Sequence, residues 1–297
     1  MALTDLAWAR AARSAAAAAL SVQAPRAVIY STTTAALLWP RPGAVRFDAL
    51  SAGNRPGRHG LWQRPLERRR LAEAPLLLPL SAGALAEAPR VPAGAERRTL
   101  VVPLPVEPSA PPAPARDIAA ITYAGNPRKK GLDRVLDAWR RTREARGVAG
   151  DELVVAGASS EQLRAAGIAL DREPGVRAVG RLPRDEYRAL LRRSRVFVTA
   201  PRREDYGQAQ LEALADGCLL ATTPAPGPYV ALPIAQRLDP QLVDDDLAVA
   251  LGGALALPDP ADYAASALRE LEPMRAAAVQ RLIAQELLPR LLGHRAG

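Results

Sequence analysis

Residues 196–223 read VFVTAPRREDYGQAQLEALADGCLLATT, in which an apolar strand pattern is followed by a helical pattern and a second apolar strand pattern. The apolar runs at 196–199 and 218–222 predict two buried strands, and the segment 207–215 between Gly207 and Gly217 predicts a helix. A strand, a crossover helix and a second strand are one unit of a parallel sheet. This stretch therefore predicts an α/β fold.

The same alternation continues upstream of this stretch. It predicts strands at 119–123, 152–156 and 176–179, and helices at 132–146, 160–166 and 184–193. Together these elements predict a doubly wound parallel sheet, whose ligands bind at the carboxyl ends of the strands. Downstream, residues 245–292 have a mostly helical pattern, and no internal repeat is visible.

The N-terminal part of the chain predicts a second, thinner α/β domain. Six prolines between residues 103 and 116 exclude a helix or a central strand there, so we interpret this segment as an extended connector. Before it, strands are predicted at 27–30, 45–47, 76–80 and 99–102, and helices at 61–72 and 81–88. We expect a reduced N-terminal domain at 1–102, a linker at 103–117, a larger domain at 118–272 and a C-terminal helical segment at 273–297.

Composition limits the classes of function. The 297 residues include 40 Lys and Arg against 31 Asp and Glu, which gives a net charge of +9. This charge suits nucleic acid, anionic lipid or a phosphate-bearing substrate. Because basic and aromatic residues are not interleaved, we expect no specific nucleic-acid binding. The single cysteine, Cys218, excludes an intrachain disulfide and is expected to be packed, so we expect a cytoplasmic protein without a signal peptide or membrane span.

A basic loop follows the predicted strand at 119–123. Residues 123–131 read YAGNPRKKG and contain the only two lysines of the chain, Lys129 and Lys130. Gly125 and Gly131 permit tight turns, and a lysine at the start of a helix adds a point charge to the free N–H groups there. The loop could bind a diphosphate, or it could be a solvated basic loop.

Two glutamates lie close to the helix at 207–215. Glu204 precedes this helix and Glu212 lies eight residues further on, about two helical turns from its start. Both carboxylates can therefore reach one ligand above that end of the helix, and carboxylates accept hydrogen bonds from hydroxyl-rich ligands such as ribose or a hexose. The alternative is that Glu212 is an ordinary surface residue of an amphipathic helix.

These motifs carry a resemblance to a known family. Residues 118–223 resemble the nucleotide-binding half of retaining glycosyltransferases of family four, which have the GT-B fold. In that family a glycine loop ending in Lys-Gly precedes a motif with two glutamates eight residues apart, and EDYGQAQLEALADG at 204–217 matches the second motif. GRLPRDEYRALLRRS at 180–194 also resembles the family segment between them.

The resemblance implies an architecture, a reaction and a set of site residues. It implies two Rossmann-like domains with parallel sheets, and the transfer of a hexose from a nucleoside diphosphate sugar to an acceptor hydroxyl, with retention and without a metal or other cofactor. The segment 274–292 would return to the first domain. Lys130 would bind the donor diphosphate beside Gly125, and Glu204 the transferred sugar; both are the candidate catalytic residues. Glu212 would bind the ribose, with the backbone of Tyr206 and Gly207 covering the donor.

Several positions depart from the family pattern. Asn126 stands where the family usually has arginine, so Arg128 or Lys129 is expected to supply a second cation, and Asp205 replaces a small residue or proline. The N-terminal half is also short. On this acceptor side Phe47 replaces a family histidine, Asp48 remains, and His59 either faces the cleft or is a surface residue. The alternative function is a catalytically impaired protein that binds a nucleotide sugar or a partner enzyme.

Two further features have open interpretations. Arg64, Arg68, Arg69 and Arg70 have helical spacing, and this predicts either peripheral association with an anionic membrane or an acidic acceptor, or an ordinary solvated helix face. The four tryptophans are expected to lie in a core or between domains: Trp8, Trp39, Trp62 and Trp139.

Overall fold

The computed structural model describes residues 2–55, 57–87, 95–111, 116–147, 150–170 and 173–293. It divides into two compact units. Unit 1 comprises Met1–Pro105 and Ala276–Gly297, and unit 2 comprises Val106–Arg275. The chain thus passes from unit 1 to unit 2 and back again. None of the described helices is long and apolar enough to cross a membrane.

Unit 2 contains a five-stranded parallel sheet in the order β6-β5-β4-β7-β8. The two strands at its centre, β4 and β7, pair directly, with Ile118 opposite Ser194 and Ile121 opposite Phe197. From β4 the chain progresses outward to β5 and β6, and then returns to β7 and β8 on the other side. The strands are β4 (Ile118–Tyr123), β5 (Leu153–Ala156), β6 (Val176–Gly180), β7 (Ser194–Thr199) and β8 (Leu219–Thr222).

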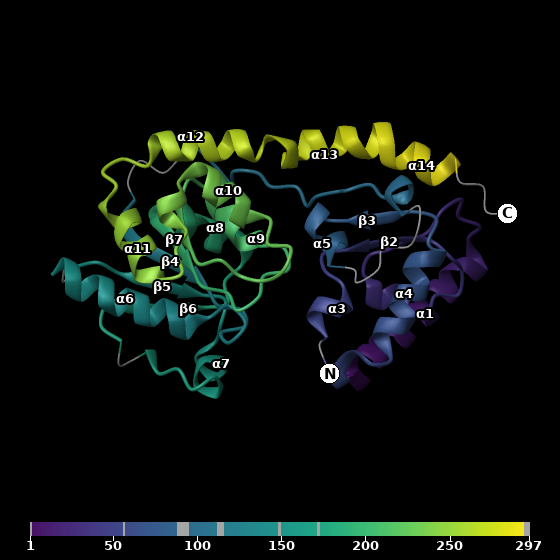
Figure 1. The fold of residues 1–297 in the computed structure, drawn as a ribbon, viewed down its shortest axis with the longest axis horizontal. Coiled ribbons are helices and arrows are strands. Elements are labelled where there is room, and N and C mark those ends of the chain that lie inside the picture. Colours follow the sequence, from purple (N-terminus) through teal and green to yellow (C-terminus); the bar gives the residue numbers. More distant parts are fainter. Residues whose placement is uncertain are drawn as a thin grey trace. The chain divides into compact units, whose positions relative to one another are not determined.

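Helices cover both faces of this sheet (Figure 1). α6 and α11 pack together on one face, where Trp139 is 1% exposed and lies in the main core cluster of the unit. α8 and α9 pack on the other face. The helices are α6 (Leu132–Arg146), α7 (Ser160–Ala165), α8 (Arg184–Arg193), α9 (Gln208–Ala215), α10 (Ala231–Leu238), α11 (Leu247–Ala256) and α12 (Ala261–Glu270). The predicted doubly wound parallel sheet is confirmed.

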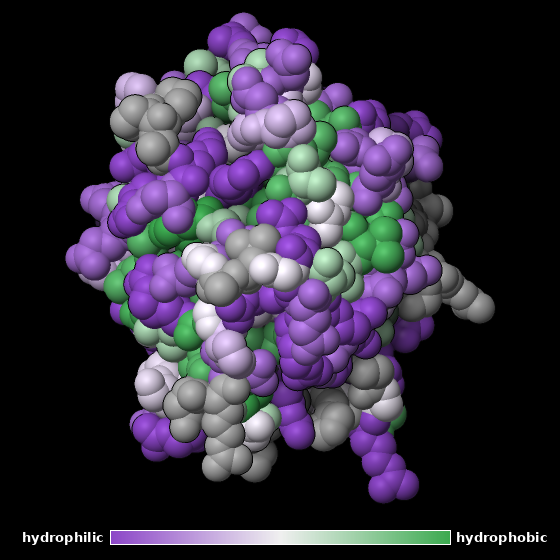
Figure 2. Space-filling view, turned by 90° about the vertical axis from the view of Figure 1, so that its left-hand side faces the viewer, coloured by the Kyte–Doolittle hydropathy of each residue, from purple (hydrophilic) through white to green (hydrophobic). Residues whose placement is uncertain are grey.

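The face of unit 2 that carries α6 and α11 is mainly hydrophilic, with apolar residues scattered over it (Figure 2). The surface of unit 2 also carries exposed ion pairs, such as Arg141 with Asp246 at 2.7 Å and Arg177 with Glu152 at 2.7 Å. Exposed pairs of this kind contribute little to stability. The unit is therefore held together mainly by the apolar residues between sheet and helices.

Unit 1 is smaller and contains a three-stranded parallel sheet in the order β1-β2-β3. Its strands are β1 (Ile29–Tyr30), β2 (Ala44–Phe47) and β3 (Leu77–Pro79). One core cluster includes Tyr30, Trp39 and Phe47. The helices are α1 (Ala2–Val22), α2 (Thr33–Ala36), α3 (Ser51–Asn54), α4 (Gln63–Glu73) and α5 (Ala82–Ala86), with short 3-10 turns at Gly57–Gly60 and Glu96–Arg98.

The C-terminal segment belongs to unit 1. It consists of α13 (Ala276–Leu282), a π-helical turn (Ile283–Leu287) and α14 (Leu288–Gly293). Its buried side chains Val279, Leu287 and Leu291 form a core cluster with residues of β2, β3 and the segments on either side of β3, namely Ala44, Leu76, Leu78, Leu100 and Val102. The second core of unit 1 is therefore built from both ends of the chain.

One local prediction for unit 1 is wrong. Residues 99–102 do not form a strand; only a single bridge joins Thr99 to Leu77. Val102 donates its N–H to the carbonyl of Pro79, but Pro79 has no N–H to donate in return, so the ladder is incomplete. Trp8 is 67% exposed on α1 and does not lie in a core, so only the other alternative, a position between domains, remains a prediction for it.

Most arginines of the expected basic face on α4 make contacts within unit 1. Arg69 and Arg70 pair with Glu73 at 2.7 Å and 2.6 Å, and the Arg70 guanidinium lies 5.2 Å from the centre of the Trp39 ring. Arg64 donates hydrogen bonds to the backbone carbonyls of Arg55 and Gly57. These contacts favour the interpretation of a structural helix.

Candidate functional site

The candidate site lies where the strand order of unit 2 reverses. β4 and β7 are neighbours, but the chain leaves them toward opposite faces of the sheet, and such a switch point leaves room for a ligand at the carboxyl ends of the strands. The loop after β4 contains Lys129 and Lys130, and the loop after β7 contains Glu204 and Asp205. The two motifs of the sequence therefore meet at one edge of the sheet.

Gly131 holds the first loop against the end of β7. It has a positive φ of 65° and forms the N-terminal cap of α6. A Cβ atom at this position would lie 1.9 Å from the carbonyl oxygen of Ala200. The loop is closed by Asn126, whose carbonyl accepts from the N–H of Lys130 at 2.9 Å and whose side-chain oxygen accepts from the N–H of Lys129 at 3.0 Å. Lys130 is thereby fixed at the start of α6.

Lys130 and Glu204 form an ion pair across the two loops. The Lys130 Nζ lies 2.6 Å from Glu204 Oε2, and the two side chains are 20% and 5% exposed. The same oxygen accepts from the Nε2 of Gln210 on α9 at 2.9 Å. Removing one partner from a buried pair costs about 3–5 kcal/mol when the other charge stays buried. Lys130 retains access to solvent and to a ligand.

The backbone of Glu204 is also fixed. Its N–H donates to the carbonyl of Pro226 at 3.0 Å, and its own carbonyl accepts from the N–H of Tyr229 at 3.3 Å. Gly227 makes this approach possible, because a Cβ there would lie 2.2 Å from the Glu204 carbonyl oxygen. The position of this carboxylate is therefore set by the loop after β8 as well as by Lys130.

A second pair of charges lies beside the first. The Lys129 ammonium contacts the Asp205 carboxylate, which also accepts from the Nε of Arg203 at 2.9 Å. The departure at Asp205 thus supplies a counter-charge for Lys129. The side chain of Arg128 is exposed, and its carbonyl accepts from Arg202 at 2.9 Å. Arg128 and Lys129 were the two cations expected to replace the missing arginine. Lys129 contacts Asp205, whereas no described ion pair includes Arg128.

A cavity of about 640 Å³ adjoins these loops within unit 2. This volume is in the range of small-molecule sites. Gly157, after β5, has a φ of 91°, and a Cβ there would lie 2.6 Å from the ring of Tyr123, so only glycine keeps this wall open. Its lining residues are Tyr123, Gly125, Ala156, Gly157, Arg181, Leu182, Arg184, Tyr187, Gln208, Ala209 and Glu212.

Glu212 presents its carboxylate to this cavity from α9. Its side chain is 12% exposed, accepts from the Nε2 of Gln208 at 3.2 Å and lies 3.3 Å from the Nη2 of Arg184. Gly207, the N-terminal cap of α9, has a φ of 91°, and no side chain caps this helix. Its preceding residue, Tyr206, is 5% exposed, and its carbonyl accepts from the N–H of Val230 at 3.0 Å.

The remaining predicted site residues lie in unit 1. Asp48 follows β2 and lines a separate cavity of that unit. His59 lies in the 3-10 turn Gly57–Gly60, and its side chain is outside the part of the chain that the structure describes. The sequence prediction did not include Tyr123, Gly157 or Tyr187 as lining residues. Tyr123 ends one predicted strand, Gly157 directly follows another, and Tyr187 lies on a predicted helix. These positions could have indicated that the three residues line a ligand site.

Cys218 is fully buried at the end of α9. Burial raises the pKa of its thiol to about 12, and the Sγ lies 3.1 Å from the carbonyl oxygen of Leu191. The expectation of a packed cysteine is confirmed.

Comparisons with known proteins give a matching family and several solved structures of similar fold. The model of the family of glycosyl transferases group 1 matches residues 118–269. Among solved structures, WaaG, a glycosyltransferase involved in lipopolysaccharide biosynthesis, is similar to this chain with a TM-score of 0.68 and 16% sequence identity. The alignment covers 92% of this chain and 80% of the WaaG chain. No curated protein sequence matches significantly.

Two further structures are similar to this chain. HepE from Anabaena, in complex with UDP and glucose, has a TM-score of 0.64 at 13% identity over 86% of this chain and 74% of its own. The UDP-forming α,α-trehalose-phosphate synthase from Burkholderia xenovorans has a TM-score of 0.67 at 16% identity over 98% of this chain and 79% of its own. Two Rossmann-like units with parallel sheets define a GT-B protein. Because the family model matches more than half of it, the chain belongs to the family of glycosyl transferases group 1.

Proposed function

We propose that this protein is a retaining, metal-independent glycosyltransferase that moves a hexose from a nucleoside diphosphate sugar to an acceptor hydroxyl. The observation that carries the proposal is the pairing of Lys130 with Glu204, 2.6 Å apart, at the switch point of the parallel sheet. A cation for a diphosphate and a carboxylate for sugar hydroxyls lie next to a cavity that Glu212 also lines. Together these three groups would bind the diphosphate, the hexose and the ribose of a nucleotide sugar.

The donor would lie across the carboxyl end of the sheet. The nucleoside would occupy the cavity of about 640 Å³, where Glu212 accepts hydrogen bonds from the ribose hydroxyls. The diphosphate would lie between Lys130 and the first turn of α9, which Gly207 leaves uncapped. The positive end of a helix and an ammonium group both stabilise a phosphate. Arg128 would supply a further positive charge at this position.

The reaction would develop negative charge on the leaving diphosphate. The bond between the anomeric carbon and the phosphate oxygen breaks, and the acceptor oxygen forms a bond to that carbon from the same face, which retains the configuration. The acceptor proton passes to the leaving phosphate oxygen. Lys130 would stabilise the growing charge, which is the role that preorganised cations have in group transfer. Glu204 would hold the hydroxyls of the hexose while Lys130 turns to the phosphate.

The choice of nucleotide to test is supported by similarity rather than by the cavity. The Anabaena protein HepE has been solved with UDP and glucose and with UDP-glucose. We therefore propose a uridine diphosphate hexose as the first donor to test. Because three of the four arginines of α4 are engaged within unit 1, namely Arg64, Arg69 and Arg70, we do not extend the proposal to an anionic membrane.

The experiment is a calorimetric titration of the purified protein with UDP, GDP and ADP. We expect one nucleotide to bind, and Lys130→Ala to weaken its affinity at least tenfold. Arg141→Ala is the matched control, because it removes a cation of unit 2 from an exposed pair with Asp246. Binding of no nucleotide, or equal binding by Lys130→Ala, would refute the donor site. Tight binding without turnover of any sugar donor would favour a nucleotide-sugar-binding partner protein instead.

A further inference from the structure

Arg188 of α8 and Asp216, which directly follows α9, form a buried ion pair that has no part in the donor binding proposed above. The Arg188 Nε lies 2.6 Å from Asp216 Oδ2, and the two side chains are 4% and 0% exposed. Replacing such a pair by apolar residues of similar volume is often neutral or stabilising, because burial removes both charges from water. Packing of α8 on α9 therefore does not by itself explain these charges.

The direction of the Arg188 guanidinium is fixed by its surroundings. Its Nη2 donates to the carbonyl of Glu107 at 2.7 Å. Asp216 is held in turn by Ser109, whose N–H and Oγ donate to Asp216 Oδ1 at 2.8 Å and 2.9 Å. Glu107 and Ser109 belong to the proline-rich segment at the start of unit 2. Because a guanidinium is planar and rigid, contacts at Nε and Nη2 also set where its third nitrogen, Nη1, points.

The third nitrogen of Arg188 faces Glu212 of the proposed donor site. The Arg188 Nη1 lies 3.7 Å from Glu212 Oε1. Gln208 Nε2 and Arg184 Nη2 also approach this oxygen, at 3.2 Å and 3.3 Å. The Arg184 side chain is 71% exposed, so water and salt screen its charge, whereas the buried charge of Arg188 is screened much less. Arg188 is therefore the fixed cation beside Glu212.

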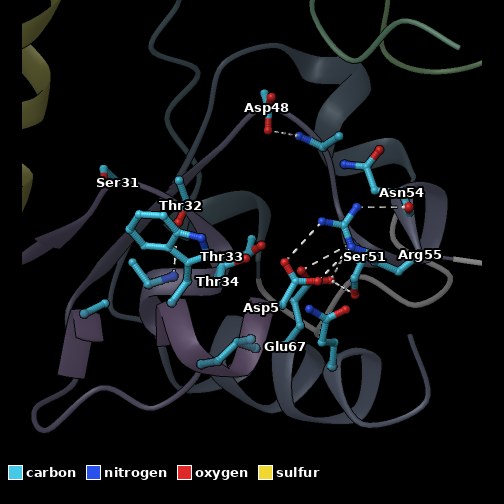
Figure 3. A pocket seen from close by; sticks show the side chains of 16 residues that line it. Asp5, Ser31, Thr32, Thr33, Thr34, Asp48, Ser51, Asn54, Arg55 and Glu67 are labelled. Atoms are coloured by element: carbon cyan, nitrogen blue, oxygen red, sulfur yellow. Dashed lines mark hydrogen bonds and ion pairs between the residues drawn. The ribbon is translucent and has the colours of Figure 1, made fainter. Parts of the chain in front are cut away.

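The contacts of Glu212 leave one of its carboxylate oxygens open. All of them reach Oε1, and within the described ranges no hydrogen bond or ion pair reaches Oε2. Glu67 of unit 1 is different, because Ser51 donates to both of its carboxylate oxygens (Figure 3). Since Glu212 lines the cavity of about 640 Å³, Oε2 is the oxygen that can accept hydrogen bonds from a ligand there.

We propose that Arg188 is a positioning residue through which the donor site prefers ribose to deoxyribose. The inference rests on the proposed function, since only a site for a nucleoside diphosphate has a ribose to recognise. Arg188 does not line the cavity; it holds the Glu212 carboxylate by Oε1, so that Oε2 accepts from the 2′-hydroxyl of the ribose. A deoxyribose lacks this hydroxyl and leaves the carboxylate oxygen unpaired, and such a loss produces strong discrimination.

A purely structural role for Arg188 gives a different expectation. If the pair with Asp216 only fastens the proline-rich segment to α8, its loss lowers stability or weakens the binding of all nucleotides alike. The ratio of the affinities for a ribonucleotide and its 2′-deoxy analogue would then stay constant. This ratio is therefore the measurement that distinguishes positioning of Glu212 from support of the fold.

The test is calorimetric titration of the full-length protein with the nucleoside diphosphate that binds best among UDP, GDP and ADP, and with its 2′-deoxy form. We expect the wild type to prefer the ribonucleotide at least about tenfold, the usual effect of one hydrogen bond to a charged group. Glu212→Ala should abolish this preference. Arg188→Lys keeps the charge but loses the planar fork, so it should reduce the preference at least about threefold. In the background of Glu212→Ala, Arg188→Lys should change the ratio no further.

Arg192→Lys is the matched control. Arg192 lies one turn further along α8 and contacts the Ser109 hydroxyl, but no described contact joins it to Glu212, so the ratio should stay at the wild-type value. Asp216→Asn provides a second variant if Arg188→Lys does not fold. It keeps the size of the side chain and an acceptor for Ser109 but withdraws the charge that holds Arg188, so it should also reduce the ratio.

Three results would overturn the inference: a wild type that binds both forms equally, a wild-type ratio in both Arg188→Lys and Asp216→Asn, or an equal fall of the ratio in Arg192→Lys. Binding of no nucleotide by the wild type would instead contradict the donor site on which the inference rests. Thermal unfolding of each sample shows whether the folded protein is being titrated.

Discussion

At the scale of single residues, Glu204 has the most constrained surroundings of the candidate site. Its carboxylate contacts Lys130 and Gln210, and its backbone is fixed by the loop after β8. A side chain held this firmly suits the binding of a reacting sugar, since misplacement of a positioned group is costly for catalysis. Glu204 is therefore the first residue to test for an effect on turnover rather than on folding.

We predict that Glu204→Gln lowers the rate of hexose transfer at least about 100-fold, the effect typical for loss of one electrostatic contact in an active site. The amide keeps the shape of the side chain, and Lys130 stays hydrated because it is 20% exposed. Steady-state kinetics with UDP-glucose and circular dichroism on the same sample measure the two effects. Glu186→Gln, an exposed residue of α8, is the control. Wild-type turnover in Glu204→Gln would remove Glu204 from the mechanism.

Glu67 gives a prediction for the pH dependence of stability. Burial raises the pKa of its carboxyl above the ordinary value, although hydrogen bonds from Ser51 oppose this shift. The folded state then binds this proton more tightly than the unfolded state does. The contribution of Glu67 is therefore fully present below its ordinary pKa, and is lost as the pH rises through the raised value.

We predict that Glu67→Gln changes the slope of stability against pH. The free energy of unfolding of the variant, relative to the wild type, should rise as the pH is increased from about 4 through neutrality, because the variant has no charge to bury. Urea unfolding at a series of pH values measures this difference. A constant difference between the two proteins at all pH values would contradict the assignment of a raised pKa to Glu67.

At the scale of elements, the two ends of α6 form a natural comparison. Gly131 and Gly147 both have positive φ, at 65° and 62°. A Cβ would collide with Ala200 at the first position and would meet nothing within 4 Å at the second. A change of glycine to alanine at position 147 therefore measures only the cost of the left-handed backbone conformation. The same change at position 131 also includes the cost of displacing the loop that carries Lys130.

We predict that Gly147→Ala destabilises the protein by about 1 kcal/mol, the usual cost of a left-handed alanine. Gly131→Ala should cost at least about 2 kcal/mol and should also weaken nucleotide binding at least tenfold, because the loop that carries Lys130 must move away from β7. Thermal unfolding and calorimetric titration of both variants provide the comparison. Equal nucleotide affinity in the two variants would show that the contact with Ala200 does not position Lys130.

The strands of unit 2 and its helices as far as α9 could be predicted to within about two residues, because buried parallel strands are continuous apolar runs and glycines mark the ends of the helices. The helix α10 was not predicted, and α11 and α12 were predicted only as part of a mostly helical stretch at 245–292. Unit 1 was less predictable. The helix α1 was not predicted, since its alanine-rich sequence has a weak apolar face, although alanine favours a helix. The absence of a strand at 99–102 depends on Pro79, which lies at least twenty residues earlier in the sequence.

The candidate site could be located from sequence but not assembled from it. The spacing of Lys130, Glu204 and Glu212 was visible, whereas the pairing of Lys129 with Asp205 requires knowledge that β4 and β7 are adjacent. The lining residues after β5 and β6 could not be selected without the strand order. Of the residues that line the cavity of unit 1, the sequence analysis named Asp48 as a candidate; the cavity as a whole was not predicted, because its residues come from four separate segments of unit 1.

At the scale of the whole molecule, unit 1 depends on the last helices of the chain for its second core. We predict that Leu291→Ala destabilises unit 1 by about 2 kcal/mol or more, the usual cost of truncating a buried leucine. Leu291 is 9% exposed, whereas its neighbour Leu292 is 40% exposed, so Leu292→Ala should have little effect. Differential scanning calorimetry measures both.

The same variants should leave nucleotide binding intact. All residues of the proposed donor site lie in unit 2, so the UDP affinity of Leu291→Ala below its unfolding temperature should stay within twofold of the wild type. A large loss of affinity would show that the donor site needs unit 1. Equal unfolding temperatures for Leu291→Ala and Leu292→Ala would contradict the core role of Leu291.

The division of unit 1 between both ends of the chain sets the order of events during synthesis. A ribosome adds about 5–20 residues each second, so the roughly 170 residues of unit 2 take on the order of ten to thirty seconds to make. During that interval the apolar side chains of Leu78, Leu100 and Val102 have been made, but Leu287 and Leu291 have not. These side chains of the nascent first unit therefore remain uncovered while unit 2 is made. We expect a chaperone that binds apolar segments to bind them during this interval.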